Sequence, residues 1–198
     1  MDQAFLSSYF FAQPQNEQSH LIDKLQALKL VVFDVDGVLT DGGLLYSESG
    51  EQLKRFNVKD GVALKLLPKW GVEVAIITAK DSPPLRMRMK DLGIQHFYLG
   101  CHNKVEAFND LTGRLGFDKQ HTAYVGDDVI DLQVMPSVGV SFCPADAHVL
   151  VTRCCAISLL NKGGQGIARE VSDIILASRM SLERAYNVAI EPEFEKVK

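Results

Sequence analysis

Short, almost uninterrupted apolar runs alternate with amphipathic segments along most of the chain, and this alternation constrains the fold more than any other feature. The runs lie at residues 30–34, 72–78, 96–100, 122–127, 139–142 and 155–158. Helical candidates lie near residues 60–69, 82–92, 103–115, 128–135, 145–151 and 166–180. Strands that are apolar on both faces and separated by helices are typical of a parallel sheet covered on both sides. The sequence therefore predicts an α/β protein with a doubly wound, mostly parallel sheet.

One domain is expected, because the chain has 198 residues of which 46% are hydrophobic. Residues 1–18 are rich in Gln, Ser and Asn and are interpreted as a mobile or loosely docked tail. A first helix is expected from Ser19, the domain spans 19–180, and residues 181–198 are interpreted as a C-terminal tail. Residues 42–56 break the alternation and predict a β-hairpin flap, which could pack on itself or on a neighbouring subunit.

Composition narrows the function by exclusion. The net charge of -4 argues against a nucleic-acid partner. No apolar run approaches the ~20 residues that cross a bilayer. No Lys or Arg precedes Lys24, which argues against a secretory signal and favours a cytoplasmic location. The cysteines form no C-x-x-C pair and are interpreted as small structural thiols; they are Cys101, Cys143, Cys154 and Cys155.

Acidic residues follow two of the predicted strands. Asp34 and Asp36 lie in DVDGVLTDG after the first run, and VGDDVIDL after the fourth contributes Asp127, Asp128 and Asp131. Because the carboxyl ends of parallel strands share one edge of the sheet, these side chains are expected to gather there. Carboxylates without a nearby Cys or His favour Mg²⁺ over zinc. We therefore predict a magnesium site with Asp34 and Asp127 as direct ligands.

The same edge carries groups suited to phosphoryl transfer. Asp34 can attack phosphorus, and Asp36 can protonate the leaving alkoxide and later activate water. Thr78 closes the second run and Lys104 opens a helix after the third, so a hydroxyl and a positive charge would meet the transferred group. DVDG alone also fits an ordinary turn, and Thr78 alone fits a strand. The hypothesis rests on all of them occurring in order.

DVDGVLTDG, Thr78 in AIITAKD, Lys104 and GDDVID together resemble the four motifs of the haloacid dehalogenase (HAD) superfamily. The resemblance implies that Asp34 is the nucleophile and Asp36 the acid/base. It implies that magnesium is held by Asp34, the Asp36 backbone carbonyl and Asp127. Two further residues would support the site, Asp128 and Asp131. An Asp at position 36 is shared by the phosphatases and phosphomutases of that superfamily, so it favours phosphate hydrolysis.

From about residue 21 to 180 the chain is similar to the 3-deoxy-D-manno-octulosonate 8-phosphate (KDO8P) phosphatases. The segments that carry the similarity are LVVFDVDGVLTDGGLLYSESGEQLKRFNVKDG, VEVAIITAKDS, LGIQHFYLGCHNK, AYVGDDVIDLQVM and KGGQGIAREVSD. The similarity implies a HAD-like, Rossmann-type core and a homotetramer that hydrolyses an acidic sugar phosphate for lipopolysaccharide synthesis. Only 44 positions separate Asp34 from Thr78, which leaves room for the hairpin but not for a cap domain.

By the same similarity, a set of polar and backbone groups would contact the sugar: Asp36, Asn57, Val58, Lys59, Asp60, Gly61, Lys65, Lys80, Arg88 and Lys104. The chain departs from the family where Gly-Arg commonly follows the Thr of the second motif, because Ala79 and Lys80 stand there. A lysine is a point charge and cannot grip a carboxylate with two parallel hydrogen bonds, so recognition of the sugar carboxylate is expected to differ.

Two other functions stay open from the sequence. One is a capless phosphatase for a related acid sugar, such as a nonulosonate 9-phosphate, which offers the same carboxylate and terminal phosphate. The other is a non-catalytic binding module on the same fold. The presence of Asp36 argues against the binding module, because binding needs no acid/base.

Overall fold

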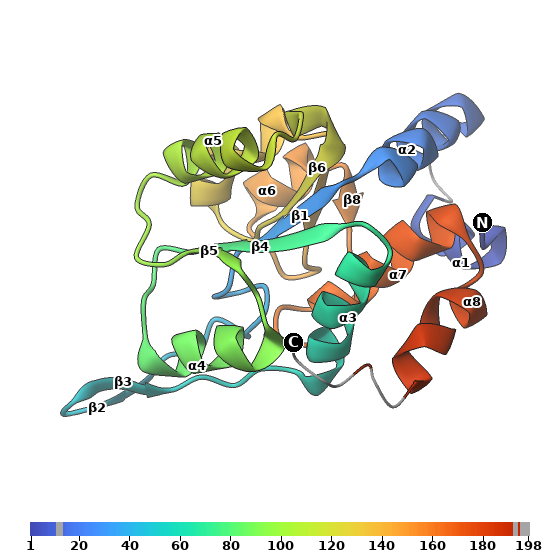
Figure 1. The fold of residues 1–198 in the computed structure, drawn as a ribbon. Helices are drawn as coiled ribbons and strands as arrows, with labels where there is room; N and C mark the ends of the chain where they lie inside the picture. Colours follow the sequence, from blue (N-terminus) through green and yellow to red (C-terminus); the bar gives the residue numbers. More distant parts are fainter. Residues whose placement is uncertain (11–13, 192–193, 195–198) are drawn as a thin grey trace.

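Six parallel strands form the centre of the molecule in the computed structural model, which describes residues 1–10, 14–191 and 194 (Figure 1). The strand order is β5-β4-β1-β6-β7-β8. The strands are β1 (Leu30–Phe33), β4 (Glu73–Ile77), β5 (His96–Tyr98), β6 (Thr122–Val125), β7 (Val140–Cys143) and β8 (Ile157–Ser158). All five pairings between neighbours are parallel. The predicted doubly wound parallel sheet is therefore confirmed.

Both faces of the sheet are covered, because alternate side chains of each strand enter two separate cores. In β1, Val31 and Phe33 belong to one core and Leu30 and Val32 to the other. The first core contains residues of α1 (Gln3–Phe10), α2 (Gln15–Ala27), α3 (Val58–Lys69), α4 (Pro83–Leu92), α7 (Ile167–Arg179) and α8 (Leu182–Tyr186). The second contains residues of α5 (Lys104–Leu115) and α6 (Val149–Cys154). This explains why the strands are apolar throughout.

The N-terminal segment, which was expected to be mobile or loosely docked, contains helices in its described part, while residues 11–13 lie outside the described residues. Residues 3–10 form α1, whose Leu6 and Phe10 are buried in the first core beside α7. Helix α2 begins at Gln15 rather than at Ser19. At the other end, α8 and the 3-10 helix η4 (Asn187–Ile190) occupy the first part of the predicted C-terminal tail, whereas residues 192–193 and 195–198 lie outside the described residues. Burial of apolar side chains holds α1 in place. The polar composition of the segment gave no indication of this burial.

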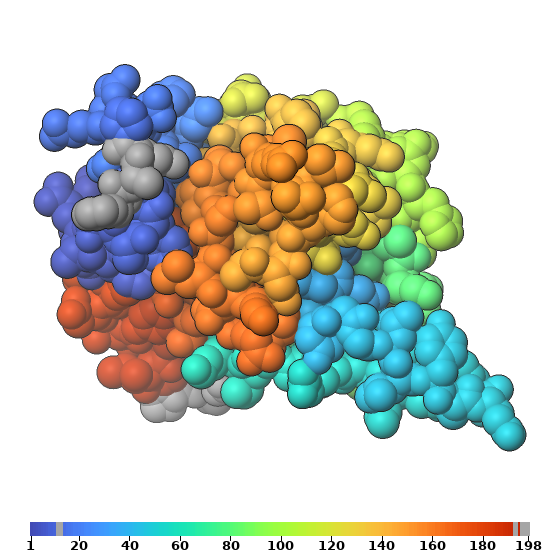
Figure 2. Space-filling view, turned by 180° about the vertical axis from the view of Figure 1, so that it is seen from behind, coloured from blue at the N-terminus to red at the C-terminus, as the bar shows by residue number. Residues whose placement is uncertain are grey.

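The predicted hairpin is present as antiparallel β2 (Leu45–Ser47) and β3 (Gly50–Leu53). Its Leu45, Tyr46 and Leu53 side chains are exposed, so the hairpin does not bury them on itself within one chain. The hairpin projects from the body of the molecule in the space-filling view (Figure 2).

The α-helix expected over 128–135 is replaced by two short 3-10 helices, η2 (Val129–Gln133) and η3 (Met135–Ser137). The Asp131 carboxylate accepts hydrogen bonds from the amides of Asp127 and Asp128, which holds the chain in a tight capped turn. Pro136 then has no N–H to continue a helix.

The path of the chain reverses at β1. From β1 the chain first adds β4 and β5 on one side, then returns to place β6, β7 and β8 on the other. Loops that leave β1 and β6 at their carboxyl ends therefore diverge, which is where open α/β sheets bind ligands. None of the helices in the described part of the chain has the length and apolar character needed to span a membrane.

Candidate active site

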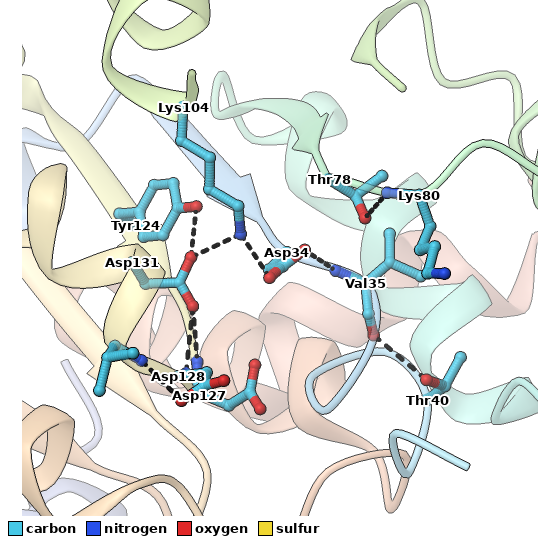
Figure 3. A network of polar contacts seen from close by, with 11 residues as sticks. Asp34, Val35, Thr40, Thr78, Lys80, Lys104, Tyr124, Asp127, Asp128 and Asp131 are labelled. Atoms are coloured by element: carbon cyan, nitrogen blue, oxygen red, sulfur yellow. Dashed lines mark hydrogen bonds and ion pairs between the residues drawn. The ribbon is translucent and has the colours of Figure 1, made fainter. Parts of the chain in front are cut away.

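A buried lysine links the two acidic segments at the point where the loops diverge (Figure 3). The Lys104 Nζ donates to Asp34 Oδ2 over 2.5 Å and to Asp131 Oδ1 over 2.7 Å. Asp34 follows β1, Asp131 lies in η2 after β6, and Lys104 is the first residue of α5. All three residues are buried. The convergence expected from the sequence is thus present, although 70 positions separate Asp34 from Lys104.

Asp131 organises the acidic segment after β6. Its Oδ1 accepts from Lys104 and from the Tyr124 hydroxyl over 2.8 Å, and its Oδ2 accepts from the amides of Asp127 and Asp128 over 3.0 and 3.2 Å. Both oxygens are therefore occupied by protein donors. Asp131 positions the other groups and has little capacity left for a ligand, whereas the exposed Asp128 caps η2 through its bond from the Val129 amide.

Asp127 lies against the loop that carries Asp34. A Cβ on Gly37 would stand 2.0 Å from Asp127 Oδ2, and Gly37 has a φ of 88°. Any other residue at position 37 would both strain the backbone and displace the carboxylate. The glycine of DVDG therefore brings the two acidic segments together, and one carboxylate oxygen from each of Asp34, Asp127 and Asp131 lies within 4.8 Å of the others.

The electrostatics of this cluster favour a cation. Burial raises the pKa of Asp34 to about 6 despite the nearby Lys104 ammonium. Burial, together with the carboxylates of Asp34 and Asp131, raises the pKa of Asp127 to about 7. Burial alone would lower the pKa of Lys104, but Asp34 and Asp131 outweigh it and raise that pKa. One ammonium faces three carboxylates, so a further positive charge would stabilise their ionised forms.

The donor set fits a magnesium ion. Asp127 Oδ1 and Asp36 Oδ2 are buried and have no hydrogen-bond partner among the described residues. Such unpaired buried oxygens are costly unless an ion or water satisfies them. The cluster contains only carboxylate oxygens, with neither thiolate nor imidazole, and these hard donors suit Mg²⁺.

Thr78 and Lys80 lie on the side of Asp34 opposite Lys104 (Figure 3). Thr78 is buried at the end of β4, and its Oγ1 accepts from the Lys80 amide over 3.3 Å. The hydroxyl hydrogen of Thr78 is therefore available to a phosphate oxygen, while the exposed Lys80 side chain can turn toward a bound anion.

Sequence reasoning did not assign a role to Lys54, which reaches the site from the end of the hairpin. Its side chain is 1% exposed and its Nζ donates to Asp36 Oδ1 over 2.5 Å while pairing with Glu51 Oε1 over 2.7 Å. Thr40 also donates to Asp36 Oδ1, over 3.2 Å. Hairpin lysines are usually solvated. The contact is therefore visible only in the tertiary structure, in which residues 53–56 lie against residues 34–37. Lys54 and Thr40 fix one oxygen of Asp36 and leave Oδ2 unpaired.

Replacing Lys54 with Met is expected to lower kcat by ~30-fold with a smaller change in KM, because it removes the ammonium that holds Asp36 Oδ1 in place. The measurement is steady-state hydrolysis of a sugar phosphate at saturating Mg²⁺. Lys69→Met, at an exposed position of α3, is the control. An unchanged kcat in Lys54→Met would contradict the positioning role.

The residues expected to contact the sugar fall into different places. Asn57 caps α3, accepts from the Lys59 amide and donates to the Gly164 carbonyl. The Arg88 guanidinium donates to the Asn57 carbonyl over 3.4 Å and would meet a Cβ on Gly61 at 2.9 Å. The Val58 and Lys59 side chains are exposed beside this group.

Asp60 lies with Asn57 and Arg88, whereas Lys65 lies elsewhere. The Asp60 carboxylate is buried, accepts from the Arg169 amide over 3.0 Å, and joins α3 to the first turn of α7. Lys65 lines a groove with Glu73 and His96, the first residues of β4 and β5. That groove is at the amino ends of the strands, whereas Asp34 follows the carboxyl end of β1. Within one chain, Lys65 is therefore not brought to the Asp34 site.

Comparison with known proteins gives a consistent result. No protein-family model matches the chain. It is 44% identical over 156 residues to the KDO8P phosphatase KdsC of Haemophilus influenzae, covering 79% of this chain and 87% of that protein. It is 41% identical over 171 residues to KdsC of Escherichia coli, covering 86% and 90%.

Solved structures agree with the curated relatives. A HAD superfamily (subfamily III A) hydrolase from Legionella pneumophila aligns with a TM-score of 0.83 at 37% identity, covering 87% of this chain and 95% of that one. The KDO8P phosphatase from Moraxella catarrhalis, in complex with magnesium, phosphate and KDO, aligns with a TM-score of 0.82 at 32% identity, covering 90% and 100%.

The parallel sheet, the hairpin in place of a cap domain and the carboxylates around Lys104 define a phosphatase of the HAD superfamily. Within that class, the chain belongs to the KDO8P phosphatase family, because relatives of this family match it at about 40% identity over most of its length.

Proposed function

We propose that this protein hydrolyses KDO8P to KDO and inorganic phosphate through a phosphoryl group carried on Asp34. The observation that carries the reaction is the Lys104 ammonium held between Asp34 and Asp131, beside Asp127. Family membership supports the sugar, since the H. influenzae relative bears that name at 44% identity. The product would then serve lipopolysaccharide synthesis.

Asp34 is suited to nucleophilic attack by its surroundings. The Val35 amide donates to Asp34 Oδ1 over 2.7 Å and Lys104 donates to Oδ2, so the carboxylate is held in one orientation. Attack of one of these oxygens on phosphorus forms the aspartyl phosphate and breaks the bond to the sugar oxygen. The Lys104 ammonium and the Thr78 hydroxyl would stabilise the charge on the transferred phosphoryl oxygens.

Asp36 would move the protons. Because Lys54 and Thr40 occupy Oδ1, the unpaired Oδ2 can protonate the leaving sugar alkoxide. The same oxygen can then take a proton from the water that attacks the aspartyl phosphate, which releases phosphate and restores Asp34.

Mg²⁺ is the proposed cofactor, held by Asp34, the Asp36 backbone carbonyl and Asp127. When bound, it would offset the negative charge that keeps an anionic phosphate away from an anionic carboxylate. The unpaired Oδ1 of Asp127 and the excess of carboxylates over ammonium groups support this assignment.

A substrate panel tests the proposal. With Mg²⁺ present, we expect kcat/KM for KDO8P to exceed that for neutral sugar phosphates by ~10²-fold or more, because basic side chains would pair with the sugar carboxylate. Removal of Mg²⁺ with EDTA should abolish turnover, and added Mg²⁺ should restore it. Faster turnover of a nonulosonate 9-phosphate than of KDO8P would contradict KDO8P as the substrate. A protein that hydrolyses no phosphoester would contradict the phosphatase proposal and favour the non-catalytic binding module.

Assembly as a homotetramer is also proposed. The exposed Leu45, Tyr46 and Leu53 of the hairpin support it, since a neighbouring chain could cover them. Light scattering of the purified protein tests this proposal, and a monomer would contradict it. The expected cytoplasmic location and the expected absence of a nucleic-acid partner stay predictions.

A further inference from the structure

Two of the four free cysteines are in contact on the side of the sheet that carries α6. Cys143 ends β7 and is fully buried, while Cys155 follows α6 and is half-buried. Their Sγ atoms are 3.0 Å apart. A disulfide needs them to be about 2.05 Å apart, so bond formation requires a shift of only about an ångström. The two cysteines are 12 positions apart in the sequence and lie on different elements, so no local spacing rule would pair them.

The surroundings make one sulfur the better nucleophile. The thiol–thiol hydrogen bond lowers the pKa of Cys155 against the effect of burial, and the Ser158 hydroxyl adds to the lowering. The same thiol–thiol hydrogen bond and burial raise the pKa of Cys143. Ser158 is exposed and lies 3.4 Å from Cys155 Sγ, so small polar oxidants can approach the less buried sulfur.

We propose that Cys143 and Cys155 form a redox-active dithiol which hydrogen peroxide converts into an intramolecular disulfide. The Cys155 thiolate attacks the peroxide, forming an S–O bond and breaking the O–O bond, and the released hydroxide takes a proton to become water. The Cys143 sulfur then attacks the Cys155 sulfur, which forms the S–S bond and breaks the S–O bond. The proton of Cys143 leaves with that oxygen as a second water, so two thiols are oxidised as one peroxide is reduced.

This dithiol lies in a segment that supports the proposed metal site. Between the two cysteines, the His148 amide donates to the Asp127 carbonyl over 2.8 Å, and Asp146 accepts from the Gly163 amide over 2.9 Å. A disulfide would covalently join the two ends of residues 143–155, the segment that contains α6. The modification site is nevertheless separate from the reacting groups, because neither sulfur contacts the carboxylate cluster.

Two matched double variants test the proposal. Cys101→Ser/Cys154→Ser keeps the proposed dithiol, and Cys143→Ser/Cys155→Ser keeps the exposed Cys154 and the distant Cys101. With a small molar excess of hydrogen peroxide, the first variant should lose both thiols at least ~10-fold faster than the second, because only it has an activated thiolate beside a resolving thiol. Its mass should fall by about 2 Da as a monomer, and dithiothreitol should return both thiols.

Peptide mapping of the wild-type protein gives a second readout that does not depend on the variants folding. Trypsin should leave residues 120–153, which hold Cys143, joined to residues 154–162, and fragmentation should place the link on Cys155 rather than Cys154. Added oxygen atoms without a link, a link through Cys154, covalent dimers, or equal rates of thiol loss in the two double variants would each overturn the proposal.

Discussion

Asp34→Asn should abolish phosphatase activity, with kcat at least ~10⁴-fold below wild type, because an amide cannot displace an alkoxide from phosphorus. The change is nearly isosteric, so the Val35 amide can still bond to the side-chain oxygen. We expect the fold to survive, since Asn also removes a buried carboxylate whose pKa is raised to about 6 by burial. The measurement is phosphate release from KDO8P at saturating Mg²⁺.

Asp91→Asn, at an exposed position of α4, is the matched control for Asp34→Asn and should keep full activity. Circular dichroism should show that both variants are folded. In wild-type protein, acid quenching during turnover of a phosphate-labelled substrate should trap label on the chain, and in Asp34→Asn it should not. Substantial Mg²⁺-dependent turnover by Asp34→Asn would contradict the covalent route.

Lys104→Met should damage both catalysis and stability. The residue is 2% exposed and its ammonium is the contact between Asp34 and Asp131. Without it, two buried carboxylates lose their positive partner, and removing one member of a buried ion pair typically costs about 3 kcal/mol of unfolding free energy. We expect the midpoint of thermal unfolding to fall by about 8 °C for a domain of this size. Loss of the charge from the transferred phosphoryl group should lower kcat/KM by ~10³-fold.

Lys90→Met, on the exposed face of α4, removes the same charge without these contacts and should leave both measurements unchanged. Lys104→Arg separates the effect on stability from the effect on catalysis, because it keeps the positive charge but places a bulkier group at this buried position. We expect it to recover part of the stability and little of the activity. Wild-type kcat/KM in a folded Lys104→Met protein would remove Lys104 from the proposed mechanism.

The fold could be predicted because its signals are local and mutually consistent. Each apolar run became a strand of the sheet, and the position of Asp34 and Asp127 after β1 and β6 followed from the rule that parallel strands end on one edge. The convergence of Asp34, Lys104 and Asp131 needed no more than this rule and the order of the motifs.

Sequence reasoning failed where a residue contacts a partner that is distant in sequence and where the residue type alone does not indicate its role. Polar composition around α1 concealed Leu6 and Phe10, which are buried in the core beside α7. Lys54 resembles any hairpin lysine until LKRF folds over Asp36. The assignment of Lys65 to the sugar contacts stays a prediction, because its side chain lines a groove at the amino ends of β4 and β5 within one chain.

The amino-acid sequence by itself determined the alternation of strands and helices, the edge at which the carboxylates gather and the residue types needed to transfer a phosphoryl group. The tertiary structure alone decided which side chains hold those groups in place and which thiols meet, Cys143 with Cys155 among them. The physical reason is that periodicity encodes which face of an element is buried, whereas a contact between two faces depends on how separate elements pack together.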